Sequence, residues 1–123
     1  MSKTAQRELK SWIEREFAID GVLAAGGGMD AGSGFAAFAS GELVLANNDD
    51  VWRAVAENLG HLQSQGLSVE ELLWGFENAV LCSVQREDGA WVGVFTVPKL
   101  RDQSALALRA KLDEFRERQL APA

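Results

Sequence analysis

The residues that come closest to a known chemical motif are three consecutive glycines, Gly26, Gly27 and Gly28. A phosphate-binding loop needs a lysine and then a serine or threonine after its glycines, because these side chains reach the phosphates and their metal ion. Here the glycines are followed by Met29 and Asp30. The run therefore favours a strand on which a helix packs closely, since glycine carries no side chain to hold the two apart.

The other reactive side chains are scattered. His61 is the only histidine and falls on the polar side of a predicted helix, and a metal site would need further ligands. Cys82, the only cysteine, occupies an alternating strand position that is typical of a small buried residue. The acidic pair at 49–50 is expected to cap a helix, and the pair at 70–71 to lie at a solvated edge. We predict no catalytic residue, no metal and no cofactor, and hence not an enzyme.

Composition narrows the class of partner. The chain has 123 residues and a formal charge of −6, so it fits one domain over residues 1–123 and would repel a phosphate backbone, which argues against nucleic acid. Acidic residues outnumber basic ones ten to two between Asp30 and Asp88, whereas basic residues outnumber acidic ones six to four from Lys99 onward. Ordinary solubility is the preferred explanation of this asymmetry, and steering of a basic partner toward one surface is the alternative.

The same composition bears on the compartment. A single cysteine cannot form an internal disulfide, and the sequence has neither a signal peptide pattern nor an apolar run long enough to cross a bilayer. We therefore expect a cytoplasmic protein without membrane insertion.

Hydrophobic spacing and turn residues predict three helices and five strands in a mixed α/β (α+β) chain, in the order helix-strand-strand-helix-strand-strand-strand-helix. Asn and Asp residues precede the middle helix, and Asp88-Gly89 is a strong signal for a hairpin turn. The predicted helices lie at residues 4–17, 50–65 and 102–119, and the predicted strands at 22–29, 35–39, 71–77, 79–86 and 91–97.

The middle predicted helix carries an unusually wide apolar surface. At about 100° per residue, its apolar and small residues cover an arc of roughly 200°, whereas a helix resting on one sheet needs only about 100°. Val55, Leu59 and Leu62 lie within this arc, and Trp52 lies toward its edge, where a core role and an interface role are equally expected. The excess predicts burial on a second side, for which another subunit is a natural candidate.

The order of elements resembles that of the roadblock/dynein light chain family. The segment ELLWGFENAVLCSVQREDGAWVGVFT, followed by a closing amphipathic helix, is similar to the family's three-strand meander. The segment DGVLAAGGGMD resembles its opening strand, and the resemblance extends over roughly residues 5–120. The first hairpin, residues 26–41, departs from the family in its richness in Gly and Ala.

The resemblance implies a five-stranded antiparallel sheet with helices on both sides, and a homodimer in which the middle helices and the strands at 71–77 of two subunits meet. It also implies a non-catalytic module that acts as a scaffold, as a part of a motor complex, or as an adaptor or regulator of a small Ras-like GTPase. The dimer interface expected on this basis consists of Trp52, Val55, Ala56, Leu59, Leu62, Leu72, Trp74 and Phe76.

Two other functions stay open from the sequence. The Gly/Ala-rich hairpin could leave space for a ligand, which would make the protein a small-molecule sensor with a pocket near that hairpin. An enzyme is the third alternative, and the lack of a recognisable acid, base, nucleophile or metal cluster ranks it last.

Overall fold

The fold is given by a computed structural model that describes residues 3–30, 33–39, 48–64, 71–75, 79–86 and 88–117. In chain order the elements are α1 (Lys3–Glu16), β1 (Val22–Gly28), β2 (Phe35–Ala39), α2 (Asp49–Ser64), β3 (Glu71–Gly75), β4 (Val80–Gln85), β5 (Trp91–Thr96) and α3 (Asp102–Glu117). The end of the predicted strand at 71–77 and the end of the predicted last helix lie outside the described residues.

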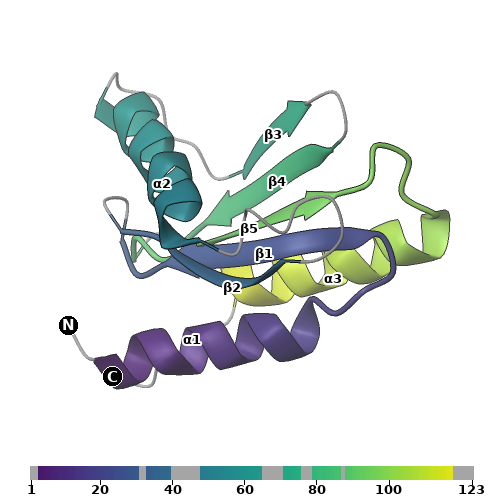
Figure 1. The fold of residues 1–123 in the computed structure, drawn as a ribbon, viewed down its shortest axis with the longest axis horizontal. Coiled ribbons are helices and arrows are strands. Elements are labelled where there is room, and N and C mark those ends of the chain that lie inside the picture. Colours follow the sequence, from purple (N-terminus) through teal and green to yellow (C-terminus); the bar gives the residue numbers. More distant parts are fainter. Residues whose placement is uncertain are drawn as a thin grey trace.

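All neighbouring strands of the sheet are antiparallel, and their spatial order is β2-β1-β5-β4-β3. Helices α1 and α3 lie against one face of this sheet and α2 lies on the other (Figure 1). The prediction of a mixed α/β fold with three helices and an antiparallel sheet is therefore confirmed. Strand β5 lies at the centre between β1 and β4, and residues of all three strands are buried on both faces of the sheet.

The first helix buries the apolar stripe that its spacing predicts. Leu9, Trp12, Ile13 and Phe17 are all buried against the sheet or its neighbouring helix. The Trp12 ring packs edge-on against Phe17, with centroids 5.4 Å apart, and lies 6.0 Å from the ring of Phe115 in α3. Aromatic contacts therefore join the two helices on this face.

Ion pairs also stabilise the packing of α1 and α3 against the sheet. The Lys111 ammonium of α3 donates to Glu16 at the end of α1 over 2.6 Å, and this hydrogen bond lowers the pKa of Glu16. The Arg86 guanidinium lies 4.8 Å from the centroid of Phe115 and pairs with Asp88, whose pKa this hydrogen bond lowers. These carboxylates are held in their charged form by structural ion pairs.

The turn between β4 and β5 forms where Asp88-Gly89 predicts it. Gly89 has a φ of 97°, a conformation that favours glycine, and its N–H donates to the carbonyl of Arg86 at 3.0 Å. The Asp88 carboxylate accepts from the Ala90 N–H at 3.0 Å. The hairpin is thus fixed by local hydrogen bonds.

The last helix differs in one respect from the face that its spacing predicts. The apolar spacing of the sequence predicts that Ala105 shares a buried face with Leu108, Leu112 and Phe115. In the structure Ser104 is the buried residue of the first turn and Ala105 is exposed. The first turn therefore presents a small polar residue to the sheet. An open space remains there between α3 and the strands, as described below.

Helix α2 sits close to the sheet because the strands carry glycine at the positions beneath Trp52. The fully buried indole of Trp52 lies over Gly26, where an added Cβ would come within 2.6 Å of its Cε2 atom, and near Gly93, where the nearest indole atom would be 3.2 Å away. A Cβ at Gly34 would lie 2.7 Å from the backbone nitrogen of Arg53. The backbone of α2 therefore packs closely against Gly34, the residue before β2, as well as against the sheet.

The indole also contacts two aromatic rings of β5. Its centroid lies 6.4 Å from that of Trp91 and 5.4 Å from that of Phe95. Trp91 is itself fixed by a hydrogen bond from its indole N–H to the carbonyl of Ser33 at 3.0 Å. These contacts make Trp52 the centre of the core on the α2 face.

This packing predicts that Gly26→Ala destabilises the protein by about 1–3 kcal/mol, because the new methyl group collides with the indole and with the Phe35 carbonyl. Gly93→Ala, a matched glycine substitution beneath the same indole, has more space and should cost less. Urea unfolding monitored by circular dichroism measures both losses. Equal losses would contradict the close seating of Trp52 on Gly26.

Candidate functional site

The acidic pair Asp49 and Asp50 forms the start of α2 and makes structural contacts. Asn48 caps the helix, since its side-chain oxygen accepts from the backbone N–H of Asp50 at 2.8 Å. The Asp50 carboxylate pairs with Arg53 at the surface. We expected the acidic pair to cap the helix, with Asn48 or Asp49 as the capping residue. Asn48 is the cap, whereas Asp49 and Asp50 belong to the first turn of the helix, where negative charge is favourable.

Asp49 has a second role that local sequence patterns did not reveal. Its carboxylate accepts the backbone N–H of Ala36 in β2 at 2.8 Å, across a sequence separation of 13 residues. Strand β2 is one of the two edges of the sheet. The start of α2 therefore satisfies a backbone donor of this edge strand, which would otherwise be available to another chain.

The opposite edge is formed by β3. Its register with β4 places Leu72 opposite Ser83 and Trp74 opposite Leu81. Among the described strands, none pairs with the outer side of β3. Ser83 is fully buried, and within the described part of the chain its hydroxyl oxygen has no hydrogen-bond partner.

Four of the eight expected interface residues are covered by their own chain. Trp52, Val55, Ala56 and Leu59 are at most 6% exposed, and all four belong to the core between α2 and the sheet. The glycines beneath the helix explain this burial. The wide apolar arc of α2 therefore does not by itself require a second subunit.

The other four expected interface residues are only partly visible. Leu62 lies near the end of α2 and Leu72 and Trp74 lie in β3, but their side chains are not described, and Phe76 lies outside the described residues. The outer side of α2 is polar and exposed, with Arg53, Glu57 and His61 among its residues. The dimer interface as a whole stays a prediction.

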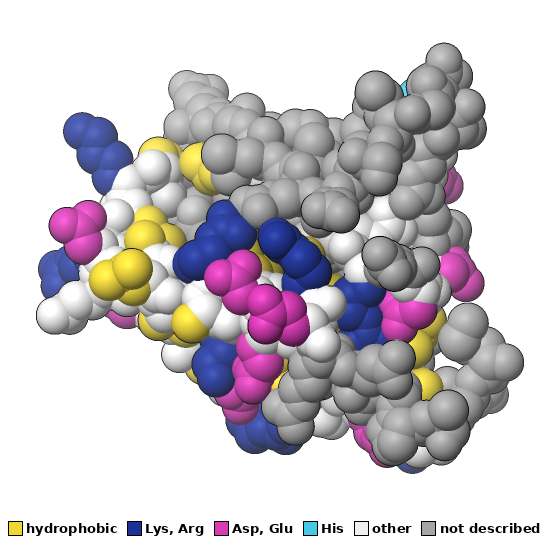
Figure 2. Space-filling model, turned by 180° about the vertical axis from the view of Figure 1, so that it is seen from behind, with side chains coloured by type: hydrophobic (Ala, Val, Ile, Leu, Met, Phe, Trp, Pro, Cys, Tyr) yellow, Lys and Arg dark blue, Asp and Glu magenta, His cyan; other side chains and the backbone are white. Residues whose placement is uncertain are grey.

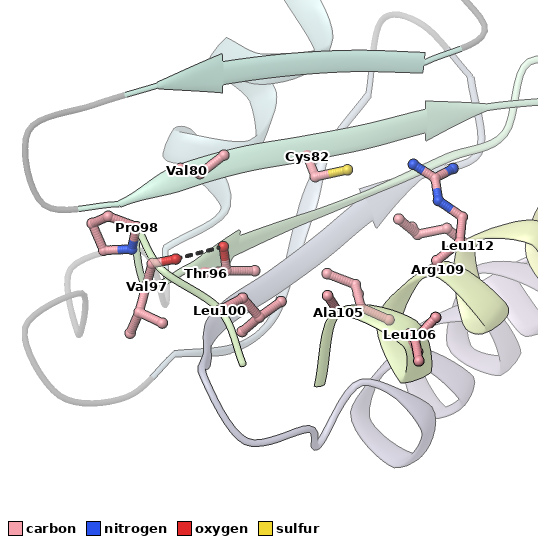
Figure 3. A pocket seen from close by; sticks show the side chains of 11 residues that line it. Val80, Cys82, Thr96, Val97, Pro98, Leu100, Ala105, Leu106, Arg109 and Leu112 are labelled. Carbon is pink, nitrogen blue, oxygen red and sulfur yellow. Dashed lines mark hydrogen bonds between the residues drawn. The ribbon is translucent and has the colours of Figure 1, made fainter. Parts of the chain in front are cut away.

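A groove opens on the opposite face of the sheet, between the first half of α3 and strands β4 and β5. Its volume is about 510 Å³, and its walls include Val80 and Cys82 of β4, Thr96 of β5, and Leu108 and Arg109 of α3 (Figure 3). The sequence pattern missed this groove because it placed Ala105 on the buried face of α3. The exposed position of that first turn could not be inferred from periodicity alone.

The two reactive residues singled out in the sequence, His61 and Cys82, do not lie together in one site. His61 lies exposed on α2, whereas Cys82 is buried in the groove wall on the other face of the sheet. Within the described ranges, no three His, Cys, Asp or Glu side chains are placed to hold a metal ion. None of the described helices combines the length and apolarity needed to cross a membrane.

The glycines of the first hairpin leave little free space. The indole of Trp52 occupies the space above Gly26, Ile13 lies 3.1 Å from a Cβ placed at Gly27, and Ser33 and Trp91 crowd Gly28. At these three positions the strand is therefore packed against other residues. A ligand pocket near the hairpin finds no support there.

Comparison with known proteins gave no assignment: no family model, curated protein or solved structure matches this chain significantly. The likeness to the roadblock/dynein light chain family therefore rests on the sequence pattern.

The contact between Asp49 and β2 yields a prediction with a matched control. Asp49→Ala should destabilise the protein by about 1–2 kcal/mol and speed hydrogen exchange at the Ala36 amide, because this donor loses its charged acceptor. Asp50→Ala removes a neighbouring acid of the same first turn, whose partner is the surface Arg53, and should cost under about 1 kcal/mol. Exchange measured by NMR distinguishes them, and unchanged exchange at Ala36 in Asp49→Ala would contradict the contact.

Proposed function

We propose that this protein is a non-catalytic homodimeric interaction module that acts as an adaptor or regulator of a small Ras-like GTPase. Two copies would pair along their β3 strands and join their sheets into one. The observation that carries the pairing is the difference between the two sheet edges. One edge has a backbone donor bound by Asp49, and the other has no described partner.

Physical reasons favour pairing at β3 over pairing at β2. An exposed edge strand offers unpaired backbone N–H and C=O groups, which a second antiparallel copy can satisfy. At β2 the Ala36 donor is already used, and the start of α2 lies over that edge. A second copy would therefore find more unpaired backbone groups to bind at β3 than at β2.

The polar outer side of α2 is consistent with a role in contacting other proteins. Arg53, Glu57 and His61 are exposed there, while the apolar residues of the helix are buried. Such a surface suits a transient partner, because reversible interfaces are about as polar as the rest of a protein surface. The choice of a Ras-like GTPase as that partner rests on the family resemblance alone.

The sensor alternative loses its original location, because the hairpin glycines are packed against Trp52, Ile13, Ser33 and Trp91. The groove beside α3 is the one described feature that would favour a small-molecule role, and it lies on the other face of the sheet.

Dimerisation predicts a mass that depends on concentration in sedimentation equilibrium, with a dissociation constant of about 10 μM or tighter. Leu72→Lys in β3 should weaken the dimer at least about tenfold, because it places a charge at the pairing edge. Leu106→Lys on α3, where the leucine is 73% exposed, serves as the control and should leave dimerisation unchanged.

Pairing through β3 would be contradicted if the wild-type protein were monomeric at tens of micromolar, about the concentration at which such a dimer should form. It would also be contradicted if Leu106→Lys dissociated the dimer. Thermal unfolding of each variant shows whether its fold is intact. If Leu72→Lys does not fold, the wild-type mass still tests whether a dimer forms at all.

The GTPase part of the proposal predicts direct binding to a Ras-like GTPase from the same cell, with different affinities for its GDP-bound and GTP-bound forms. Purified GTPases loaded with either nucleotide can be tested by biolayer interferometry against the immobilised protein. Failure of all of them to bind, with the dimer intact, would remove the GTPase and leave the homodimeric module.

A further inference from the structure

The groove beside α3 has the composition of a site for an apolar ligand. Its described lining residues are mostly aliphatic, from Val80 and Val97 on the strand side to Leu108 and Leu112 on the helix. A volume of about 510 Å³ lies within the usual range for small-molecule sites, about 300–1,000 Å³. The groove could therefore hold a flexible chain of hydrocarbon size.

The rim of the groove is also apolar. Leu106 of α3 lines it and is 73% exposed, the highest exposure of a large hydrophobic side chain among the described residues. Ala105 is exposed beside it. Figure 2 shows hydrophobic side chains at the end of the molecule where α3 begins, with positively and negatively charged side chains around them. Apolar surface at this rim would be removed from water by a bound chain.

The polar groups of the groove point to the charge of the ligand. Arg109 is the only charged residue among the described lining residues, and its guanidinium lies at the end of the groove near Cys82 (Figure 3). The Thr96 hydroxyl is already bonded to the carbonyl of Val97 at 3.1 Å. Arg109 forms an ion pair with Asp113 of the same helix, at 3.7 Å, and both side chains are about half exposed. A carboxylate bound at this end of the groove would share the guanidinium with Asp113.

The surroundings of the groove favour an anion as well. Lys99 and Arg101 are exposed on the segment that leads from β5 into α3, within the part of this acidic chain where basic residues are in excess. A guanidinium is well suited to bind a carboxylate, because it can donate two parallel hydrogen bonds to it. A ligand that complements this groove has a negative charge at the Arg109 end and hydrocarbon along the rest, and is therefore an amphiphile.

We propose that this groove binds an anionic amphiphile with a single alkyl chain and a terminal carboxylate, a fatty acid of medium length. Its alkyl chain lies between α3 and strands β4 and β5, and its carboxylate pairs with Arg109. This site goes beyond the proposed dimerisation, because it lies on the face of the sheet opposite α2 and needs no residue of β3. The two proposals can therefore fail independently.

The direct test is titration of the purified full-length chain with decanoate, below the concentration at which it forms micelles, by isothermal calorimetry. The site is located with Cys82, the only cysteine of the chain, which lines the groove and is 8% exposed. Bound decanoate should slow alkylation of Cys82 by N-ethylmaleimide at least about fivefold, as expected at high occupancy of the groove.

Head-group recognition is tested with a charge variant and its control. Arg109→Gln should weaken decanoate binding about tenfold or more, because the carboxylate loses a charge-assisted hydrogen bond, and should leave decanol binding within about twofold. Arg53→Gln removes an exposed guanidinium of α2, on the other face of the sheet, and should change decanoate binding by no more than about twofold.

Occupancy of the groove is tested with a matched pair of exposed alanines on α3. Ala105 lines the groove and Ala107 does not. Ala105→Phe should fill the entrance and abolish binding of both decanoate and decanol, whereas Ala107→Phe should bind them as the wild type does. Both positions are exposed, so both variants should fold, which thermal unfolding verifies.

Several results would overturn the proposal. Absence of decanoate binding, or binding that leaves Cys82 alkylation unchanged, would exclude the groove as its site. Equal affinity for decanoate, decanol and decylamine would contradict anion recognition by Arg109 and would show that the groove binds alkyl chains whatever their head group.

Discussion

The contact on which the rest of the structure depends is that of Trp52 with the glycines beneath it. A large indole can approach the sheet this closely only because Gly26 and Gly93 offer no side chain at those points. The helix then approaches closely enough for Gly34 to touch its backbone and for Asp49 to reach the Ala36 amide. One steric constraint therefore buries an unusually apolar helix within a single chain and also occupies one edge of the sheet.

This arrangement separates the surfaces that remain for binding. The face that carries α2 presents polar groups and borders the β3 edge, whereas the opposite face carries the apolar groove beside α3. Core packing on the two faces involves different residues, so a change at one surface need not disturb the other. Protein pairing at an edge and ligand binding in a groove are therefore compatible functions for a domain of this size.

Local sequence patterns predicted the elements well, because helix caps, alternation and turn residues act over a few positions. Phe35–Ala39 is a strand over the range expected, and Gly89 forms the turn that Asp88-Gly89 indicates. Contacts between distant segments were not predictable in the same way. The hydrogen bond from Ala36 to Asp49 and the exposure of Ala105 follow from how elements dock, which periodicity does not encode. The wide apolar arc of α2 correctly indicated extensive burial of this helix. The burial takes place within the chain, because glycines of the sheet let the helix approach closely.

The central claim is that seating α2 over β2 leaves β3 as the edge that pairs. Amide hydrogen exchange, resolved by residue and measured on the wild-type protein at low and high concentration, tests it most directly. We expect amides of β3 to exchange more slowly at high concentration, while the Ala36 amide is protected equally at both. Exchange at β3 that is independent of concentration, or protection at Ala36 that appears only at high concentration, would contradict the claim.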